Sequence, residues 1–396
     1  MSTRPRIVLK PGREKPVQQD HPWIFSGAVA RIDGMPADGD VLDVTDTRGG
    51  FLARALLNRR SQIVARVFTR DPEGDLTPEL LHDRIAAAQA RRSGVLPPDT
   101  TAYRVVFSES DGLPGLIVDR YGDILSIQCS TLGLQRRKGE IVEALRAVFN
   151  PVAIVERPDA EMLTREGLTV PTGALYGDVP PSVEFGEYGL RFVADLLGGQ
   201  KTGFFLDQRE NRRRVANYCQ DARVLNCFAY TGAFAVYAAA AGADQVINVD
   251  TSADALRLAE RQMALNRFGG ERDEYRVADV FELLREYREA GERFDVIILD
   301  PPKFAHNTEG ITRATRGYKD INLLALGLLN PNGILATFSC SGLISADLFQ
   351  KVVFGASVDA ERPAQIIERL TQAPDHPTLL SFPESEYLKG LICRAV

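Results

Sequence analysis

Cysteine is scarce in this chain, and its spacing suggests neither a metal site nor a disulfide framework. There are five cysteines in 396 residues, and no two form a Cys-x-x-Cys pair. An odd count with wide spacings argues against zinc and favours a reducing compartment. The sequence therefore predicts a cytoplasmic protein that holds no structural metal.

Long apolar runs are also missing. The most apolar stretch, residues 234–243, is ten residues long, about half of the roughly 20 residues that a membrane-spanning helix needs. The first residues, Met-Ser-Thr-Arg-Pro-Arg, lack the apolar core of a signal peptide. With 44% hydrophobic and 25% charged residues, the composition is that of a globular protein, and the length predicts two or three domains.

A net positive charge is absent, which by itself argues against a nucleic-acid partner. The chain carries a formal charge of −6, but the charges are unevenly distributed. Residues 1–72 hold 12 Lys and Arg against 8 Asp and Glu, while the remainder holds 35 against 45. A basic segment joined to an acidic body predicts that residues 1–72 form a module that holds RNA by its backbone.

The chain divides into three segments by pattern. Residues 1–72 show short β-type runs separated by Gly, Pro and Asp, which predicts a small β-barrel. Residues 73–185 mix helices and strands, beginning with a helix at a Thr-Pro pair near residue 77, and predict an α+β middle domain. Residues 186–396 alternate strand and helix regularly, which predicts an α/β domain with a parallel sheet covered on both faces.

The loops that follow the first three strands of this last segment suggest a nucleoside site. The first loop, in residues 226–234, has a single glycine, Gly232, and lacks the glycine spacing of a dinucleotide or P-loop site. Asp250 ends the second strand, where a carboxylate can accept both ribose hydroxyls, and Asp279 follows the third, where it can accept from an adenine amino group. Either acid alone is more often an exposed loop residue or a helix cap. The series predicts adenosine without phosphates, and S-adenosylmethionine is the cofactor that fits it.

The ends of the fourth and fifth strands carry groups suited to catalysis. Residues 300–304 read Asp-Pro-Pro-Lys-Phe, and the prolines end the strand and fix Asp300 at the sheet edge. Residues 337–342 place Cys340 at the same edge among Ser and Gly. We predict that Asp300 and Cys340 are catalytic. The other thiols are interpreted as buried and inert, namely Cys129, Cys219, Cys227 and Cys393.

Four runs together resemble a known family. Residues 201–212, 226–234, 300–304 and 339–342 resemble the class I methyltransferases that form 5-methylcytidine in 23S rRNA, the ribosomal RNA large subunit methyltransferase I family. The resemblance covers essentially the whole chain. It implies a PUA-like RNA-binding domain at residues 1–72, cytosine 1962 of 23S rRNA as the target, 23S rRNA or a large-subunit precursor as the partner, and assembly as a homodimer.

The resemblance also implies roles for residues around the cofactor. The run 201–212 would cross the cofactor site, with Arg209 pairing with the methionine carboxylate. We expect residues 212–214, all arginine, to face RNA or solvent. The remaining predicted cofactor contacts are Phe228, Thr231, Gly232 and Pro301.

One departure from related enzymes leaves a gap in the mechanism. Many RNA cytosine-5 methyltransferases carry a second cysteine after the fourth strand, where this chain has Lys303. The base that removes the C5 proton is therefore unidentified, and His376, near the final pair of strands, is one candidate.

The predicted chemistry explains why a thiol is needed. Cytosine C5 is too poor a nucleophile to take a methyl group directly, whereas addition of a thiolate at C6 makes C5 enamine-like. Asp300 would stabilise the charge that develops at N3 or the amino group. Two alternatives stay open: a methyltransferase for guanine N7 or adenine N6, which needs no nucleophile, and a non-enzymatic rRNA-binding assembly factor. Cys340 separates the first alternative from a C5 enzyme, and the adenosine series argues against the second.

Overall fold

The computed structural model describes residues 4–305 and 307–396, which pack into two compact units. Unit 1 holds the described residues up to Phe185 together with Ala194–Leu206 and Pro374–Ser385. Unit 2 holds Gly186–Val193, Asp207–Ala373 and Glu386–Val396. The domain boundaries that the sequence predicts, after residues 72 and 185, stay predictions.

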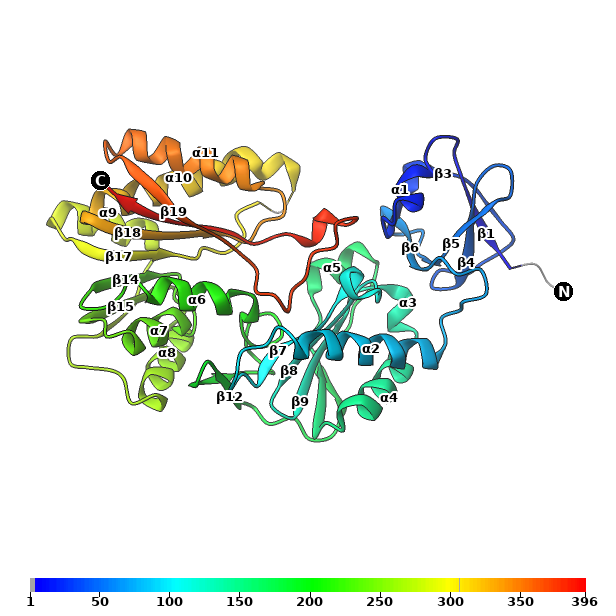
Figure 1. The fold of residues 1–396 in the computed structure, drawn as a ribbon, viewed down its shortest axis with the longest axis horizontal. Coiled ribbons are helices and arrows are strands. Elements are labelled where there is room, and N and C mark those ends of the chain that lie inside the picture. The colour runs from blue at the N-terminus through cyan, green and yellow to red at the C-terminus, as the bar shows by residue number, and fades with distance from the viewer. Residues whose placement is uncertain (1–3, 306) are drawn as a thin grey trace. The chain divides into compact units, whose positions relative to one another are not determined.

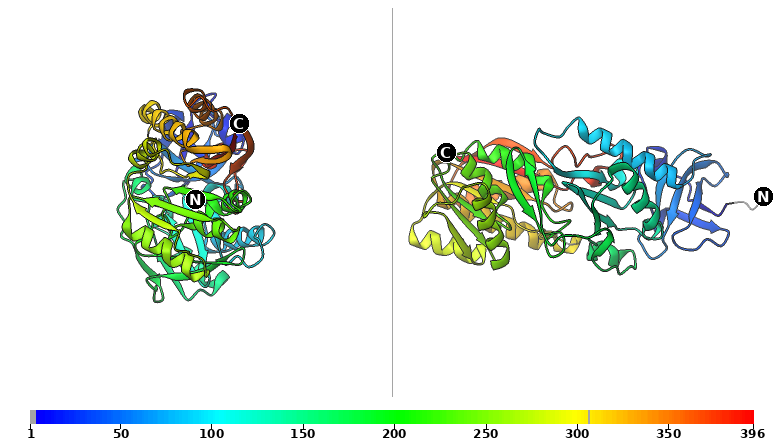
Figure 2. Two further views of the ribbon diagram at one scale, coloured as in Figure 1. Left: turned by 90° about the vertical axis from the view of Figure 1, so that its left-hand side faces the viewer. Right: turned by 90° about the horizontal axis from the view of Figure 1, so that it is seen from below.

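The first sheet of unit 1 has six strands in the order β2-β6-β5-β4-β1-β3. All its pairs are antiparallel except β1 with β4. The sheet curls around a core of aliphatic side chains that includes Leu42, Val44 and Leu57 (Figures 1 and 2). Its elements are β1 (Arg6–Leu9), α1 (Lys15–Gln18), β2 (Trp23–Phe25), β3 (Val29–Asp33), β4 (Val41–Thr45), β5 (Phe51–Leu57) and β6 (Ile63–Thr69).

The second sheet of unit 1 has five strands in the order β11-β10-β9-β8-β7 and packs against α2 and α4. The predicted helix start is confirmed, because the Thr77 side chain accepts from Leu80 N at 3.2 Å. A short helix, α3, precedes α4. The elements are α2 (Pro78–Ser93), β7 (Ala102–Phe107), β8 (Leu116–Tyr121), β9 (Ile124–Cys129), α3 (Leu132–Gln135), α4 (Lys138–Phe149), β10 (Ala153–Glu156), α5 (Ala160–Arg165) and β11 (Gly173–Tyr176).

Unit 2 is built on a seven-stranded sheet in the order β16-β15-β14-β17-β18-β20-β19. Helices α9, α10 and α11 cover one face, and α6, α7 and α8 cover the other (Figure 1). Its strands are β14 (Arg223–Cys227), β15 (Gln245–Asp250), β16 (Glu274–Val277), β17 (Phe294–Leu299), β18 (Leu329–Ser339), β19 (Ala364–Thr371) and β20 (Lys389–Ala395). Its helices are α6 (Arg209–Ala216), α7 (Ala233–Ala240), α8 (Ala253–Leu265), α9 (Val280–Ala290), α10 (Ile311–Leu328) and α11 (Ala346–Asp359). The predicted layered α/β architecture is confirmed.

Two features differ from the sequence prediction. The sheet is not wholly parallel, because β20 runs antiparallel to both β18 and β19. No α-helix separates β19 from β20, and a parallel pairing would require such a crossover. The second feature is a two-stranded sheet of β12 (Val183–Glu187) and β13 (Leu190–Ala194). Its turn residues, Tyr188 and Gly189, both have positive φ, and Tyr-Gly is not one of the dipeptides that usually mark such a turn.

No helix within the described residues is long and apolar enough to cross a membrane.

Candidate active site

The predicted site residues other than Arg209 lie along one edge of the unit 2 sheet. Strands β14 to β18 are mutually parallel, so the residues after each strand meet at the carboxyl edge. β14 pairs with both β15 and β17, which makes this the point where the strand order reverses and where ligands bind in such sheets. The residues at this edge are Phe228, Thr231, Gly232, Asp250, Asp279, Asp300, Pro301 and Cys340.

The loop after β14 has an unusual backbone. Phe228, Tyr230 and Gly232 have φ values of +58°, +46° and +73°, and a non-glycine residue in this region costs on the order of 1–3 kcal/mol. A Cβ on Gly232 would lie 2.6 Å from the Cβ of Ala259 on α8. Gly232 is therefore required by its own φ and by the contact between α7 and α8, a reason that the sequence pattern did not reveal.

Asp250 is fixed in orientation by this loop. Its Oδ2 accepts from Tyr230 N at 2.8 Å, and its Oδ1 accepts from Ser252 N at 2.9 Å. A carboxylate oxygen can accept more than one hydrogen bond, so both oxygens keep capacity for ribose hydroxyls. The buried Thr231 hydroxyl has no hydrogen-bond partner within the described part of the chain. The donors and acceptors of this loop fit an adenosine group.

Asp279 caps a helix. It is the N-cap of α9, and its Oδ1 accepts from Phe281 N at 2.8 Å and from Glu282 N at 3.2 Å. The side chain is exposed. The helix-cap alternative left open by the sequence is thus realised, and binding of adenine by Asp279 stays a prediction.

The arginines of α6 do not all face outward as expected. Arg209 and Arg212 are buried, whereas Arg213 and Arg214 are exposed. The expectation is wrong for Arg212, whose Nη2 donates to both carboxylate oxygens of Glu187 at 2.6 and 2.7 Å. The unpredicted β12–β13 hairpin supplies this partner. Arg209 begins α6, with its Nε 3.2 Å from Glu210 Oε1, and its pairing with a methionine carboxylate stays a prediction.

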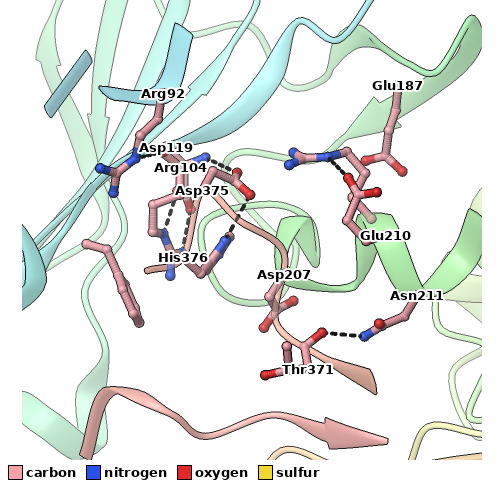
Figure 3. A network of polar contacts seen from close by, with 12 residues as sticks. Arg92, Arg104, Asp119, Glu187, Asp207, Glu210, Asn211, Thr371, Asp375 and His376 are labelled. Atoms are coloured by element: carbon pink, nitrogen blue, oxygen red, sulfur yellow. Dashed lines mark hydrogen bonds and ion pairs between the residues drawn. The ribbon is translucent and has the colours of Figure 1, made fainter. Parts of the chain in front are cut away.

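A short hydrogen-bond chain orients Asp300. Gln208 Nε2 donates to Asp300 Oδ1 at 2.9 Å, and Asn211 Nδ2 donates to Gln208 Oε1 at 2.6 Å. Asn211 is held in turn by the carbonyl of Thr371 at 3.0 Å (Figure 3). Both amide side chains are 2% exposed. No local pattern in the sequence indicates Gln208, because its partner lies 92 residues further along the chain.

Cys340 differs from the other cysteines in exposure. The prediction that Cys129, Cys219, Cys227 and Cys393 are buried is confirmed. Burial raises the pKa of Cys129 and of Cys219 to about 12 and that of Cys393 to about 11, and it raises the pKa of Cys227 further. Cys340 is partly exposed, with Sγ 3.9 Å from Pro301 O. Because the thiolate is the reactive form, the four buried thiols are poorly suited to act as nucleophiles, and a catalytic role for Cys340 stays a prediction.

Aromatic packing fixes the turns beside Cys340. The Phe304 ring lies 4.7 Å from the ring of Tyr318 on α10, so Phe304 anchors the Asp-Pro-Pro-Lys-Phe turn. Ser339 Oγ donates to the Tyr318 hydroxyl at 3.0 Å. Burial raises the pKa of Tyr318 to about 12, which keeps the phenol neutral at physiological pH.

His376 belongs to a buried polar network of unit 1. Its ring lies 5.5 Å from that of Phe107, and its Nδ1 is 3.4 Å from Asp375 Oδ1. Asp375 accepts from Arg104 N at 2.8 Å, and Arg104 pairs with both oxygens of Asp119 (Figure 3). These contacts are those of a structural residue and do not support the suggestion that His376 removes the C5 proton.

Comparison with known proteins identifies the family. The S-adenosylmethionine-dependent methyltransferase family matches residues 172–394, and the PUA-like domain family matches residues 7–70. Two relatives named ribosomal RNA large subunit methyltransferase I are similar over nearly their full length. The Cronobacter sakazakii protein is 47% identical over 99% of both chains, and the Tolumonas auensis protein is 48% identical over 98% of this chain and 99% of its own.

Solved structures show the same fold. A structure described as a SAM-dependent methyltransferase from Streptococcus mutans aligns with a TM-score of 0.84 at 23% identity, over 98% of this chain and 99% of its own. Another, described as a methyltransferase complexed with SAH, aligns with a TM-score of 0.86 at 23% identity over the same shares.

The fold and the family match define this chain as an S-adenosylmethionine-dependent methyltransferase with an N-terminal PUA-like domain. Within that class, it belongs to the ribosomal RNA large subunit methyltransferase I family.

We expect Asp250→Ala to weaken S-adenosylmethionine binding by about 10- to 150-fold. Loss of a hydrogen bond to a charged group costs about 1.5–3 kcal/mol, and Asp250 also shapes the loop through Tyr230 and Ser252. Isothermal calorimetry of the folded variant measures the effect. Asp254→Ala, at an acid that is 86% exposed on α8, is the matched control. Unchanged affinity of Asp250→Ala would remove Asp250 from the site.

Proposed function

We propose that the protein methylates C5 of a cytosine in large-subunit ribosomal RNA through a covalent bond between Cys340 and C6 of the base. The observation that carries the proposal is the placement of Cys340. Among the five cysteines, all of which lie in the described residues, it is the one that is not buried. It follows β18 at the edge where Asp300 follows β17. The names of the relatives support rRNA as the substrate.

When bound, S-adenosylmethionine would supply an electrophilic methyl group. The residues that hold it are Asp250 and the loop from Phe228 to Gly232, with Asp279, Arg209 and Pro301 as further predicted contacts. These residues bring the cofactor and the base together at one edge, which contributes much of the rate.

Cys340 and Asp300 make the base reactive. The thiolate adds to C6, and the electron pair of the C5–C6 bond becomes available at C5, while Asp300 stabilises the charge at N3 or the amino group as a proton donor or through a shared proton. After C5 has gained the methyl group, loss of the C5 proton to a base re-forms the double bond and expels the thiolate. The target nucleotide has to leave its stack to reach this edge.

The test is transfer of a labelled methyl group to total rRNA, followed by identification of the modified nucleoside. 5-Methylcytidine in large-subunit rRNA is the expected product. Methylated guanine or adenine would favour the alternative that needs no nucleophile, and absence of transfer would favour a binding role. Position 1962 as the target, a large-subunit precursor as the substrate and a homodimer are further proposals that rest on the family resemblance.

The N-terminal sheet is the part that we propose holds the RNA. Its family match is to PUA-like domains, and residues 1–72 carry the excess of basic residues. Deleting this part would be a poor test, because the buried Arg66 pairs with Glu109 and Glu166, and breaking a buried pair is strongly destabilising. Substitutions of exposed residues are cleaner.

We expect the triple substitution Lys10→Ala, Arg13→Ala and Lys15→Ala to weaken RNA binding and flatten its salt dependence. All three side chains are exposed in the PUA-like domain. Each lost phosphate contact reduces the slope of log K against log salt by about 0.7 for single-stranded RNA, so three contacts reduce it by about 2. Fluorescence anisotropy over a salt series measures the slope.

A matched triple in unit 2, Arg257→Ala, Arg272→Ala and Lys351→Ala, removes the same charge from positions about 70% exposed. The proposal predicts that this control leaves the slope nearly unchanged and that both triples bind S-adenosylmethionine normally. If the N-terminal triple variant and the unchanged protein have equal salt slopes, the PUA-like domain has a role other than binding RNA phosphates.

A further inference from the structure

A buried lysine, Lys389, contacts the loop that carries Cys340. It begins β20, and its backbone lies opposite Ser339, the residue before Cys340. Its ammonium donates to the carbonyls of Ser341 at 2.6 Å and Ile344 at 2.7 Å, both in the loop that follows Cys340. Strand register and two hydrogen bonds thus hold the ammonium against the loop.

The environment of this ammonium is unusual for a lysine. The residue is only 7% exposed, and within residues 4–305 and 307–396 it forms no ion pair. A buried charge is costly unless it is paired, and two neutral carbonyls compensate only in part. The charge that acts on it most strongly is that of the Cys340 thiolate, ahead of the exposed Glu386.

We propose that Lys389 is the positioning residue that activates Cys340, because its ammonium fixes the loop around the thiol and stabilises the thiolate. This inference rests on the proposed role of Cys340 as the nucleophile. Lys389 itself need not touch the RNA or the cofactor. The positive charge has the sign that a thiolate requires. Because Lys389 is buried, little solvent reaches its ammonium to screen the charge.

The protonation behaviour of Lys389 is consistent with this role. Burial lowers the pKa of Lys389 to about 8, and the Cys340 thiolate opposes that decrease. Coupling between two sites is reciprocal, so the ammonium favours the thiolate to the same extent. The ammonium is present below about pH 8 and is lost as the pH rises through that value, so its assistance to Cys340 is greatest at and below neutral pH. Tyr318 is a further titratable group in this region, and it interacts electrostatically with both Cys340 and Asp300.

The pH dependence of alkylation in the full-length protein tests the proposal without RNA or cofactor. Iodoacetamide should react first with Cys340, because the other four thiols are buried, and mass spectrometry of the peptide gives the rate between pH 5 and 10. In Lys389→Met, the pH at half-maximal rate should rise by about one to three units. At high pH the variant should reach the rate of the unchanged protein, because both then present a thiolate.

Two further variants separate charge from shape. Lys389→Arg keeps the charge and should leave the midpoint near its original value, whereas Lys389→Gln can still donate to the loop carbonyls but should shift the midpoint as methionine does. The Gln variant also serves if methionine prevents folding. Lys351→Met, at a lysine 70% exposed on α11, is the control and should not change the midpoint.

An unchanged midpoint in both neutral variants overturns the proposal. A lower alkylation rate at every pH with an unchanged midpoint also overturns the proposal, because a disordered loop alone would give that result. If the neutral variants keep the alkylation midpoint but accumulate a protein–RNA adduct, the proposal is overturned. That result would favour Lys389 as the base that removes the C5 proton. Failure of the proposed function looks different, because either Cys340→Ala would then still methylate RNA or the unchanged protein would transfer no methyl group, whatever the alkylation profile.

Discussion

Replacing Cys340 with alanine is expected to abolish methylation while the protein still folds and binds both S-adenosylmethionine and RNA. Without the thiolate, C5 of cytosine stays too weak a nucleophile to take the methyl group. Loss of a covalent nucleophile in other enzymes lowers the rate by on the order of 10⁶, so the labelled product should fall below detection. The measurement is transfer of labelled methyl to rRNA, with cofactor binding measured in parallel.

Cys227→Ala is the matched control for this result. Cys227 ends β14 beside the cofactor loop, but its side chain is 1% exposed and burial raises its pKa far above neutral. We therefore interpret it as a packing residue and expect the variant to methylate at nearly the original rate. Full activity of Cys340→Ala would contradict the mechanism and favour a target atom that needs no nucleophile.

Replacing Asp300 with asparagine should lower kcat by about 10²- to 10⁴-fold, the range typical of a lost acid or base. Asparagine keeps the size of the side chain and can still accept the hydrogen bond from Gln208, but it cannot supply or share a proton with the base. Steady-state methylation at saturating cofactor measures the effect. A kcat within about threefold of the original would mean that Asp300 only shapes the turn.

Gln208→Leu is the companion variant. It leaves the Asp300 carboxyl in place and removes the hydrogen bond that orients it, so we expect a smaller loss of kcat than in Asp300→Asn. In the double variant, Gln208→Leu should add little to the loss from Asp300→Asn, because both changes act through one carboxyl group. Fully additive losses would show that Gln208 acts elsewhere.

The sequence predicts much of the site because strand ends can be read directly from patterns. Asp250, Asp300 and Cys340 each follow an apolar run of β-type residues, and parallel strands bring such ends to one edge. The same reasoning predicts a glycine after the first strand. It does not predict that Gly232 is needed for contact with Ala259 on α8, because the approach of two helices depends on packing between distant segments.

The residues that sequence reasoning missed have partners far along the chain. Lys389 meets the Cys340 loop only because β20 turns back antiparallel beside β18, and nothing local in the sequence sets that register. Arg212 was expected to face outward, but Glu187 from an unpredicted hairpin neutralises it in the interior. Such pairings depend on the sheet as a whole. The sequence offers a local signal only for Lys389, which lies in an otherwise apolar segment, whereas Arg212 lies among other charged residues.

Trapping of the enzyme on RNA that carries 5-fluorocytidine at the target tests the central claim most directly. Fluorine cannot leave C5 as a proton does, so elimination stalls after methyl transfer and the Cys340–C6 bond persists. The account predicts a protein–RNA adduct that survives denaturation and carries the methyl group only when S-adenosylmethionine is present. It should form with Cys227→Ala and be absent with Cys340→Ala. An adduct that Cys340→Ala still forms, or active methylation of 5-fluorocytidine RNA with no adduct from the unchanged enzyme, would contradict covalent catalysis by Cys340.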